Sequence, residues 1–192
     1  MTSEGGLAGT YRIEVEPHGC FVCGELNTDG LRLPIYSSAD RAWTEVTIEP
    51  RFQGWADLSH GGILATLLDE VMGWALFERD CWGVTAEMTV RYQRPVPVGK
   101  RVRVEGWAGE VRRRLFRAEG RIVDTADGTV LCTASATYVG ADEATKAALK
   151  RRYRFRLVPV TDDGGPPDVT EPEPEPPSSA EQAPAPAPAS AS

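Results

Sequence analysis

The sequence predicts an α+β protein in which a single antiparallel sheet wraps around one buried helix. Three observations predict it: an apolar run of helical length, several alternating segments typical of strands, and turn signals between them. The chain has 192 residues, of which 41% are hydrophobic. A chain of this length and composition suits one domain with an additional tail.

The helix is predicted from Ile63 to Phe77. At fifteen residues the apolar run is too long for a typical strand, and its apolar side chains cover nearly the whole helix circumference. A helix of that kind is expected to be surrounded by protein. Before it, residues 41–48 alternate between apolar and polar side chains and predict a strand, followed by a turn-rich loop over residues 49–59.

The segments after the helix read as an antiparallel meander. Strands are predicted at Thr85 to Tyr92, Arg101 to Gly109, Leu115 to Val123 and Val130 to Val139. The last two form a hairpin across the turn at residues 124–128, which contains two aspartates and a glycine. One helix followed by such a meander favours a single sheet packed on that helix.

The ends of the chain differ in composition from its middle. We expect an N-terminal arm over residues 1–17, the domain over 18–140, a basic segment over 141–160 and a disordered tail over 161–192. The basic segment has a helical pattern at Asp142 to Lys150, followed by a basic strand or arm. The tail holds nine of the fifteen prolines and too little apolar surface to offset its ordering entropy.

Charge and hydropathy exclude several classes of partner. The net charge is -7, but the seven acids after residue 160 have no basic counterpart, so 21 acids and 21 bases remain in residues 1–160. A near-neutral body gives no general affinity for nucleic acid. The sequence contains no apolar run long enough to span a membrane and no signal peptide pattern. With only four cysteines, a cytoplasmic protein is expected.

The strongest candidate for chemistry is the start of the helix. His60, Gly61 and Gly62 stand where unpaired backbone N–H groups carry a partial positive charge, which would polarise a carbonyl oxygen. Asp69 follows about two turns later on an otherwise apolar helix, where a carboxylate is costly to place without partners. Glu70 points about 100° away and is a second candidate, although a dimer contact or surface acid is the simpler interpretation.

Several motifs occur in a characteristic order over residues 18–140. The helix start and Asp69 are preceded by Cys20-Phe21-Val22-Cys23-Gly24, Asn27, Gly30-Leu31-Arg32-Leu33 and Phe52-Gln53-Gly54-Trp55, and followed by Thr85 to Pro95. In this order and spacing they resemble the hotdog thioesterase superfamily, most closely its phenylacetate-pathway (PaaI-like) group of acyl-CoA thioesterases.

This resemblance implies a hotdog fold and an acyl-CoA substrate that is hydrolysed by water, with no cofactor and no metal. It implies homodimers with continuous sheets, sometimes paired as tetramers, and active sites made by both subunits. Asp69 would be the general base or the nucleophile. Gly61 N–H would polarise the thioester carbonyl, with Gly62 supporting the turn. His60 would orient the helix start or the leaving thiolate, Thr85 on the partner's strand would place the water, and Gln53 would lie near the sulfur.

Coenzyme A carries phosphates, so basic residues are expected near its site. The cluster Arg112, Arg113 and Arg114 lies at a turn of the sheet, and Arg91 is a second choice. Exposed arginines that discourage strand-edge aggregation are an equally good interpretation.

Two rival functions and one rival site remain open. A hotdog hydratase or dehydratase acting on enoyl-thioesters needs an Asp and a His near the helix start, whereas Asp69 lies deep in the helix. A non-catalytic acyl-CoA-binding module is the other alternative. His18, Cys20 and Cys23 have the spacing of part of a zinc site, but no second cysteine pair follows, so packed thiols are expected.

Overall fold

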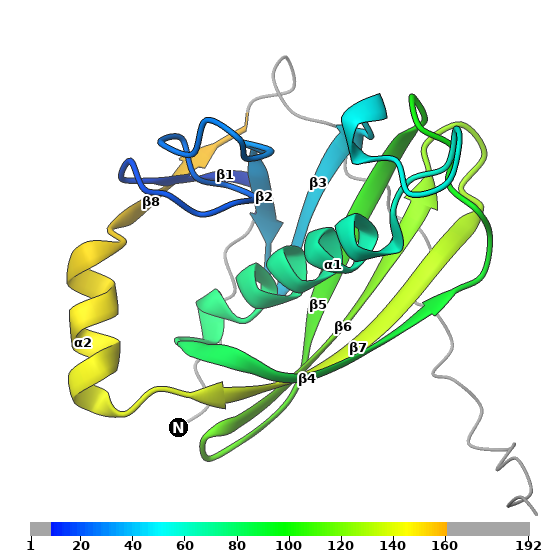
Figure 1. The fold of residues 1–192 in the computed structure, drawn as a ribbon. Helices are drawn as coiled ribbons and strands as arrows, with labels where there is room; N and C mark the ends of the chain where they lie inside the picture. The colour runs from blue at the N-terminus through cyan, green and yellow to red at the C-terminus, as the bar shows by residue number, and fades with distance from the viewer. Residues whose placement is uncertain (1–8, 161–192) are drawn as a thin grey trace, which may run out of the picture.

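One antiparallel sheet of eight strands and one long helix form the architecture of the computed structural model, which describes residues 9–160 (Figure 1). The strands are β1 (Tyr11–Val15), β2 (Ile35–Ser38), β3 (Arg41–Thr47), β4 (Gly83–Tyr92), β5 (Arg101–Arg112), β6 (Leu115–Asp124), β7 (Val130–Gly140) and β8 (Phe155–Pro159). Their order in the sheet is β4-β7-β6-β5-β3-β2-β1-β8. The helices are α1 (Gly61–Ala75) and α2 (Glu143–Arg152), with short 3-10 turns at Pro50–Phe52 and Phe77–Arg79.

The helix α1 lies across the curved sheet, as predicted, and forms the core with it (Figure 1). Its buried residues recur at helical spacing on one face: Leu64, Leu67, Leu68, Val71, Met72 and Ala75. Glycines let the helix approach the sheet closely, because a Cβ added at Gly106 would lie 2.9 Å from the Met72 backbone. Gly106 is paired with Gly120 on β6. The α+β hotdog class predicted from the sequence is therefore confirmed.

One side of α1 is not covered by the sheet. Gly62 is exposed, and Thr66, Asp69 and Gly73, which follow at helical spacing, are only partly buried. The neighbouring edge strand β4 is exposed along most of its length. The expectation that protein surrounds α1 was therefore wrong for a single chain, since the sheet curves around only part of the helix.

The sheet extends beyond the domain limits expected at residues 18 and 140. The arm contributes β1, which pairs with β2 and with β8 from the basic segment. Ile13 on β1 and Ile35 on β2 are buried, so these strands belong to the core. Asp142 caps α2 by accepting a hydrogen bond from the Thr145 N–H, close to the predicted helix start. The expected tail, residues 161–192, lies outside the described residues.

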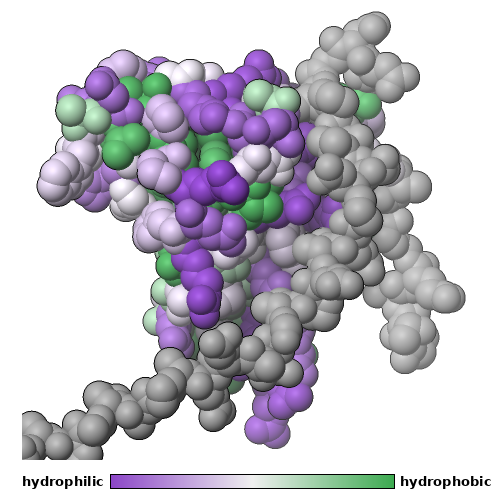
Figure 2. All heavy atoms as spheres, turned by 90° about the vertical axis from the view of Figure 1, so that its right-hand side faces the viewer, coloured by the Kyte–Doolittle hydropathy of each residue, from purple (hydrophilic) through white to green (hydrophobic). Residues whose placement is uncertain are grey.

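No helix within residues 9–160 is both long and apolar enough to cross a membrane. Seen from the right-hand side of Figure 1, the surface is largely hydrophilic, with apolar side chains interspersed (Figure 2).

Candidate active site

The N-terminus of α1 is built by His60 and two glycines. His60 is the N-cap, and its Nδ1 accepts a hydrogen bond of 2.9 Å from Gly62 N–H. Tyr92 on β4 donates to the Gly61 carbonyl at 2.9 Å and packs its ring where a Gly61 side chain would be. Within residues 9–160 the Gly61 N–H has no hydrogen-bond partner. This N–H remains available to a ligand oxygen, as the sequence predicts.

Gln53 lies beside this helix start. The adjacent Phe52 carbonyl accepts from His60 N–H at 2.9 Å, and Gln53 forms an isolated bridge with Ser59. Its side chain is exposed. Gln53, His60 and Gly61 therefore form one group, which we call the helix-start group.

Asp69 is held by two hydroxyl groups from neighbouring strands. Thr85 Oγ1 on β4 donates to Asp69 Oδ1 at 2.6 Å, and the Tyr138 hydroxyl on β7 lies 3.0 Å from the Asp69 carbonyl and 3.2 Å from Oδ1. Thr85 and Tyr138 are register partners in the sheet. In the described part of the chain, Asp69 Oδ2 has no partner, so one carboxylate oxygen stays free on the open side of α1.

Burial and the nearby Asp69 charge both raise the pKa of Tyr138, so its hydroxyl stays protonated and donates. Sequence reasoning missed Tyr138, because a tyrosine in an alternating strand reads as core. Thr85 contacts Asp69 of its own chain, whereas the resemblance had placed it on the partner's strand. We call Asp69, Thr85 and Tyr138 the carboxylate group.

The two groups lie apart within one chain. Gly61 and Asp69 are eight residues apart on α1, which separates them by about 12 Å along the helix axis. One small ligand group cannot contact the Gly61 N–H and the Asp69 carboxylate of the same chain at once, because about 12 Å separates them. The helix-start group and the carboxylate group are therefore two separate places on one chain.

Glu70 belongs to neither group. It is partly buried, and its carboxylate accepts from Trp74 Nε1 at 2.9 Å and lies 3.5 Å from Cys20 Sγ. Its interpretation as a surface acid was wrong, and it lies on a different face of α1 from the contacts of Asp69. Among the described residues, Glu70 has no hydrogen bond with Asp69, Thr85 or Tyr138. These contacts give it no role in binding a substrate at the carboxylate group.

The turn between β5 and β6, which we call the basic turn, contains Arg112, Arg113 and Arg114, and the three side chains have different contacts. Arg114 donates twice to the Gly140 carbonyl, at 2.9 and 2.8 Å, and Arg112 pairs with Glu110 at 2.6 Å. Arg113 forms the turn itself with a φ of 51° and has no ionic partner among residues 9–160. Since Gly140 pairs with Gly83, this turn lies at the Thr85 end of β4. Arg91 is exposed near the other end of that strand.

The fold and the two groups define a class: a hotdog domain that presents a carboxylate and a glycine-opened helix start on the open side of its central helix. Residues 58–131 match the family model of the thioesterase superfamily. The matched segment includes α1, Asp69 and Thr85. No curated protein matches the chain by sequence.

Solved structures show the same fold. A crystal structure described as a thioesterase superfamily protein is 28% identical over 62% of this chain and 59% of its own, with a TM-score of 0.59. The PaaI protein from the phenylacetic acid degradation operon of E. coli is 16% identical over 57% of this chain and 80% of its own, with a TM-score of 0.54. A Streptococcus mutans protein bound to acetyl CoA is 15% identical over 53% and 82%, with a TM-score of 0.51.

Proposed function

We propose that this chain hydrolyses an acyl-CoA thioester to a carboxylic acid and coenzyme A. The observation that carries the proposal is the carboxylate group: Thr85 and Tyr138 hold one oxygen of Asp69 and leave the other free on the open side of α1. A free carboxylate oxygen beside bound hydroxyls suits a general base that accepts a proton from water, or a nucleophile. The family match and the acetyl CoA-bound structural neighbour support the substrate class.

The complete site would be assembled by two subunits. Pairing two copies of β4 across a two-fold axis sets the uncovered sides of two α1 helices against each other in opposite directions. The helix-start group of one subunit would then face the carboxylate group of the other. The exposed edge strand and the small side chains on that side of α1 support this arrangement.

In the proposed reaction, the thioester oxygen accepts the free Gly61 N–H of one subunit, which stabilises negative charge as it develops. Asp69 of the other subunit removes a proton from water while the water oxygen attacks the carbonyl carbon. The carbonyl double bond then re-forms as the carbon–sulfur bond breaks, the sulfur leaves with the electron pair, and the proton that Asp69 accepted passes to the thiolate. In the alternative route, Asp69 attacks the carbonyl carbon and displaces the thiolate, and water then hydrolyses the resulting anhydride to the acid and free Asp69.

In this proposal His60 assists the departing sulfur. Because its Nδ1 accepts the Gly62 N–H, the neutral ring carries its proton on Nε2. That Nε2–H is a donor beside the Gly61 N–H, and the Gln53 amide is a second donor. Both fit a role in stabilising the thiolate.

Coenzyme A would bind with its phosphates near the basic turn. Arg113 is the best candidate, because Arg112 and Arg114 already have acceptors on the protein. We also propose that the substrate resembles those of PaaI-like thioesterases. The protein would be cytoplasmic, and two dimers would pair to form a tetramer.

The decisive test uses two variants that each disable one of the two groups. Asp69→Asn removes the base, and Gly61→Pro removes the N–H at the first helical position, where proline preserves the helix. Thiol release from a panel of acyl-CoA thioesters should fall by about a hundredfold or more in either variant, as expected for a catalytic base or an oxyanion donor. Gly61→Ala keeps the N–H but adds a Cβ 3.3 Å from the Tyr92 ring, so it controls for the side-chain contact that proline also introduces. Asp29→Asn at an exposed site is the second control.

Mixing the two inactive variants tests the composite site. Unfolded and refolded together, they should regain about a quarter of wild-type activity, because half of the dimers pair unlike subunits and each such dimer has one intact site. No recovery in verified mixed dimers would contradict the two-subunit site. No thiol release by the wild type from any acyl-CoA would contradict the hydrolase, and tight acyl-CoA binding without turnover would then indicate a binding module.

A further inference from the structure

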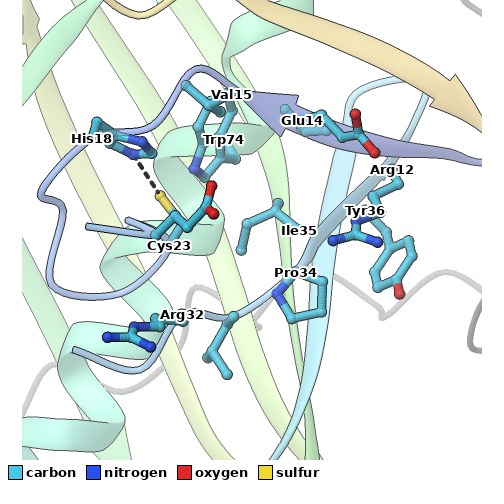
Figure 3. A pocket seen from close by; sticks show the side chains of 13 residues that line it. Arg12, Glu14, Val15, His18, Cys23, Arg32, Pro34, Ile35, Tyr36 and Trp74 are labelled. Atoms are coloured by element: carbon cyan, nitrogen blue, oxygen red, sulfur yellow. Dashed lines mark hydrogen bonds between the residues drawn. The ribbon is translucent and has the colours of Figure 1, made fainter. Parts of the chain in front are cut away.

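A second cluster of reactive side chains lies on the other side of α1, away from Asp69. The N-terminal loop between β1 and β2 brings His18, Cys20 and Cys23 together, and their donor atoms all lie within 4.8 Å of one another. Glu70 from α1 completes the cluster, with its Oε2 3.5 Å from Cys20 Sγ. Figure 3 shows His18 and Cys23 facing each other, with Trp74 close by.

Two of the donor distances match those between neighbouring ligands of a tetrahedral zinc ion, and small side-chain rotations would bring the remaining donors to the same spacing. Zinc binds sulfur at about 2.3 Å and nitrogen or oxygen at about 2.0 Å, which separates neighbouring donor atoms by about 3.5 Å. His18 Nε2 lies 3.4 Å from Cys23 Sγ, and Glu70 Oε2 lies 3.5 Å from Cys20 Sγ. Two sulfurs, one imidazole and one carboxylate form a donor set that zinc prefers.

Three of the four donors are also oriented by a second hydrogen bond, as metal ligands usually are. His18 Nδ1 lies 3.0 Å from the Glu16 carbonyl, which fixes the proton there and leaves the Nε2 lone pair toward the cluster. Trp74 Nε1 donates to Glu70 Oε1 at 2.9 Å and leaves Oε2 toward Cys20. Val22 N–H donates to Cys20 Sγ at 3.4 Å, an interaction that favours the thiolate.

The loop backbone is shaped for this arrangement. Gly24 N–H donates to the Cys20 carbonyl at 3.0 Å, and a Cβ at Gly24 would come within 2.6 Å of the His18 and Cys20 backbone. Only glycine can pack its backbone this closely against His18 and Cys20. Gly24 therefore allows the loop to turn back so that His18, Cys20 and Cys23 lie together.

The contacts of the cluster include no lysine or arginine. Within residues 9–160, neither Cys20 nor Glu70 has a hydrogen bond or ion pair with either type of side chain. A divalent cation would supply the positive charge that two sulfur ligands and a carboxylate require.

We propose that His18, Cys20, Cys23 and Glu70 form a four-coordinate zinc site that ties the N-terminal loop to α1. Sequence spacing gave three of the donors; the fourth, Glu70, comes from a helix far along the chain. The cleft of about 490 Å³ lined by His18, Cys23 and Trp74 gives the ion a path from solvent. Binding would release the remaining thiol protons to solvent. This site is structural and does not depend on the proposed hydrolase activity.

The test is metal binding by the full-length protein under reducing conditions. Elemental analysis after zinc loading and dialysis should give one zinc per chain, and cobalt should produce thiolate-to-metal charge-transfer bands. Cys20→Ser, Cys23→Ser and His18→Ala should lose stoichiometric zinc, and Glu70→Gln should weaken zinc binding at least tenfold in competition with a chromophoric chelator. Cys81→Ser and Cys132→Ser, which alter cysteines outside the cluster, should bind as the wild type does.

Glu70→Cys gives a readout that general unfolding would not produce. If residue 70 is a ligand, the cobalt charge-transfer band should grow by about half, since three thiolates replace two among the four ligands. Failure of the reduced wild type to bind zinc or cobalt would overturn the proposal. So would wild-type affinity in the Cys20→Ser/Cys23→Ser double variant, or a Cys20–Cys23 disulfide that persists under reducing conditions and excludes metal.

Discussion

Asp69 and Glu70 are adjacent acids with separate surroundings. One helical step of about 100° directs Asp69 to the hydroxyls of β4 and β7, and Glu70 to the N-terminal loop. Asp69 meets protonated donors and keeps one free oxygen, whereas Glu70 meets thiols. The same functional group, a carboxylate, therefore has a proposed catalytic role at one position and a proposed ligand role at the next.

Tyr138→Phe tests how Asp69 is positioned. The variant removes a hydroxyl that contacts both the Asp69 carbonyl and Oδ1, so the carboxylate is held less firmly, by Thr85 alone among the described residues. We expect acyl-CoA turnover to fall about tenfold and the free energy of unfolding to fall by about 1 kcal/mol, the usual net value of one hydrogen bond. Steady-state kinetics and urea unfolding measure both effects. Tyr36→Phe, at another buried tyrosine, should leave turnover unchanged; equal losses of turnover in both variants would contradict the positioning role.

Glu70 should make metal-free protein less stable as pH rises. Its pKa in the folded state, about 7, lies above its usual value of 4.5, so ionisation opposes folding. The cost is absent below about pH 4.5, grows between pH 4.5 and 7, and is complete above pH 7.

Glu70→Gln should therefore stabilise the chelator-treated protein at pH 8 by on the order of 1 to 3 kcal/mol, with little effect at pH 4.5. Urea unfolding at both pH values, with wild type and variant compared at each, measures this difference. Saturating zinc should reverse the order at pH 8, because the variant lacks a ligand. The same stabilisation at both pH values would show that Glu70 ionisation is not responsible.

The sequence could single out Asp69, Gly61 and His60 as candidates because two glycines at a helix start and a carboxylate in an apolar helix are local signals. It could not find Tyr138, whose contact with Asp69 spans 69 positions of the chain. It also could not assign Glu70, because the partner Cys20 lies 50 positions away and the helix pattern gives direction but not neighbours. Side-chain roles set by such long-range contacts need the folded structure.

At the scale of elements, α1 and the sheet meet closely at Gly106 on β5. Gly106→Val would bring side-chain atoms against the backbone of Val71 and Met72, which cannot move without displacing the helix. We expect a loss of about 1 to 3 kcal/mol or more in the free energy of unfolding, typical of overpacking. Thermal and urea unfolding measure it. Gly19→Ala, where an added Cβ meets nothing within 4 Å, is the matched control; equal effects would refute tight packing at Gly106.

Long, regular elements were predictable with their bounds, whereas β1 and β2 were not predicted and β8 was expected only as a basic strand or arm. The helix and the strands β3 to β7 carry clear periodicity over seven or more residues, and their predicted positions agree with the structure. β1, β2 and β8 have only four or five residues each, too few to separate alternation from chance. They are strands because they pair with one another and with β3, a tertiary effect that no local pattern contains.

For the whole molecule, the exposed edge strand β4 predicts a dimer. Val84 on β4 is 72% exposed and would be covered by a second subunit. Val84→Asp should shift sedimentation from dimer toward monomer and lower acyl-CoA turnover with it, because the interface would bury an unpaired charge. Leu26→Asp alters a residue that is 64% exposed in the N-terminal loop and should leave the dimer intact. A fully active wild-type monomer would contradict the prediction.

The pairing of β1 with β8 also sets an order of events in folding. Glu14 and Arg156, which form an ion pair across these strands, are separated by 142 positions of the chain. Bringing such distant segments together costs more chain entropy than closing the β6–β7 hairpin, so this strand pair is expected to assemble late. In native-state hydrogen exchange, β8 should open at lower free energy than β5 to β7, and the sheet would loosen first at the edge opposite β4.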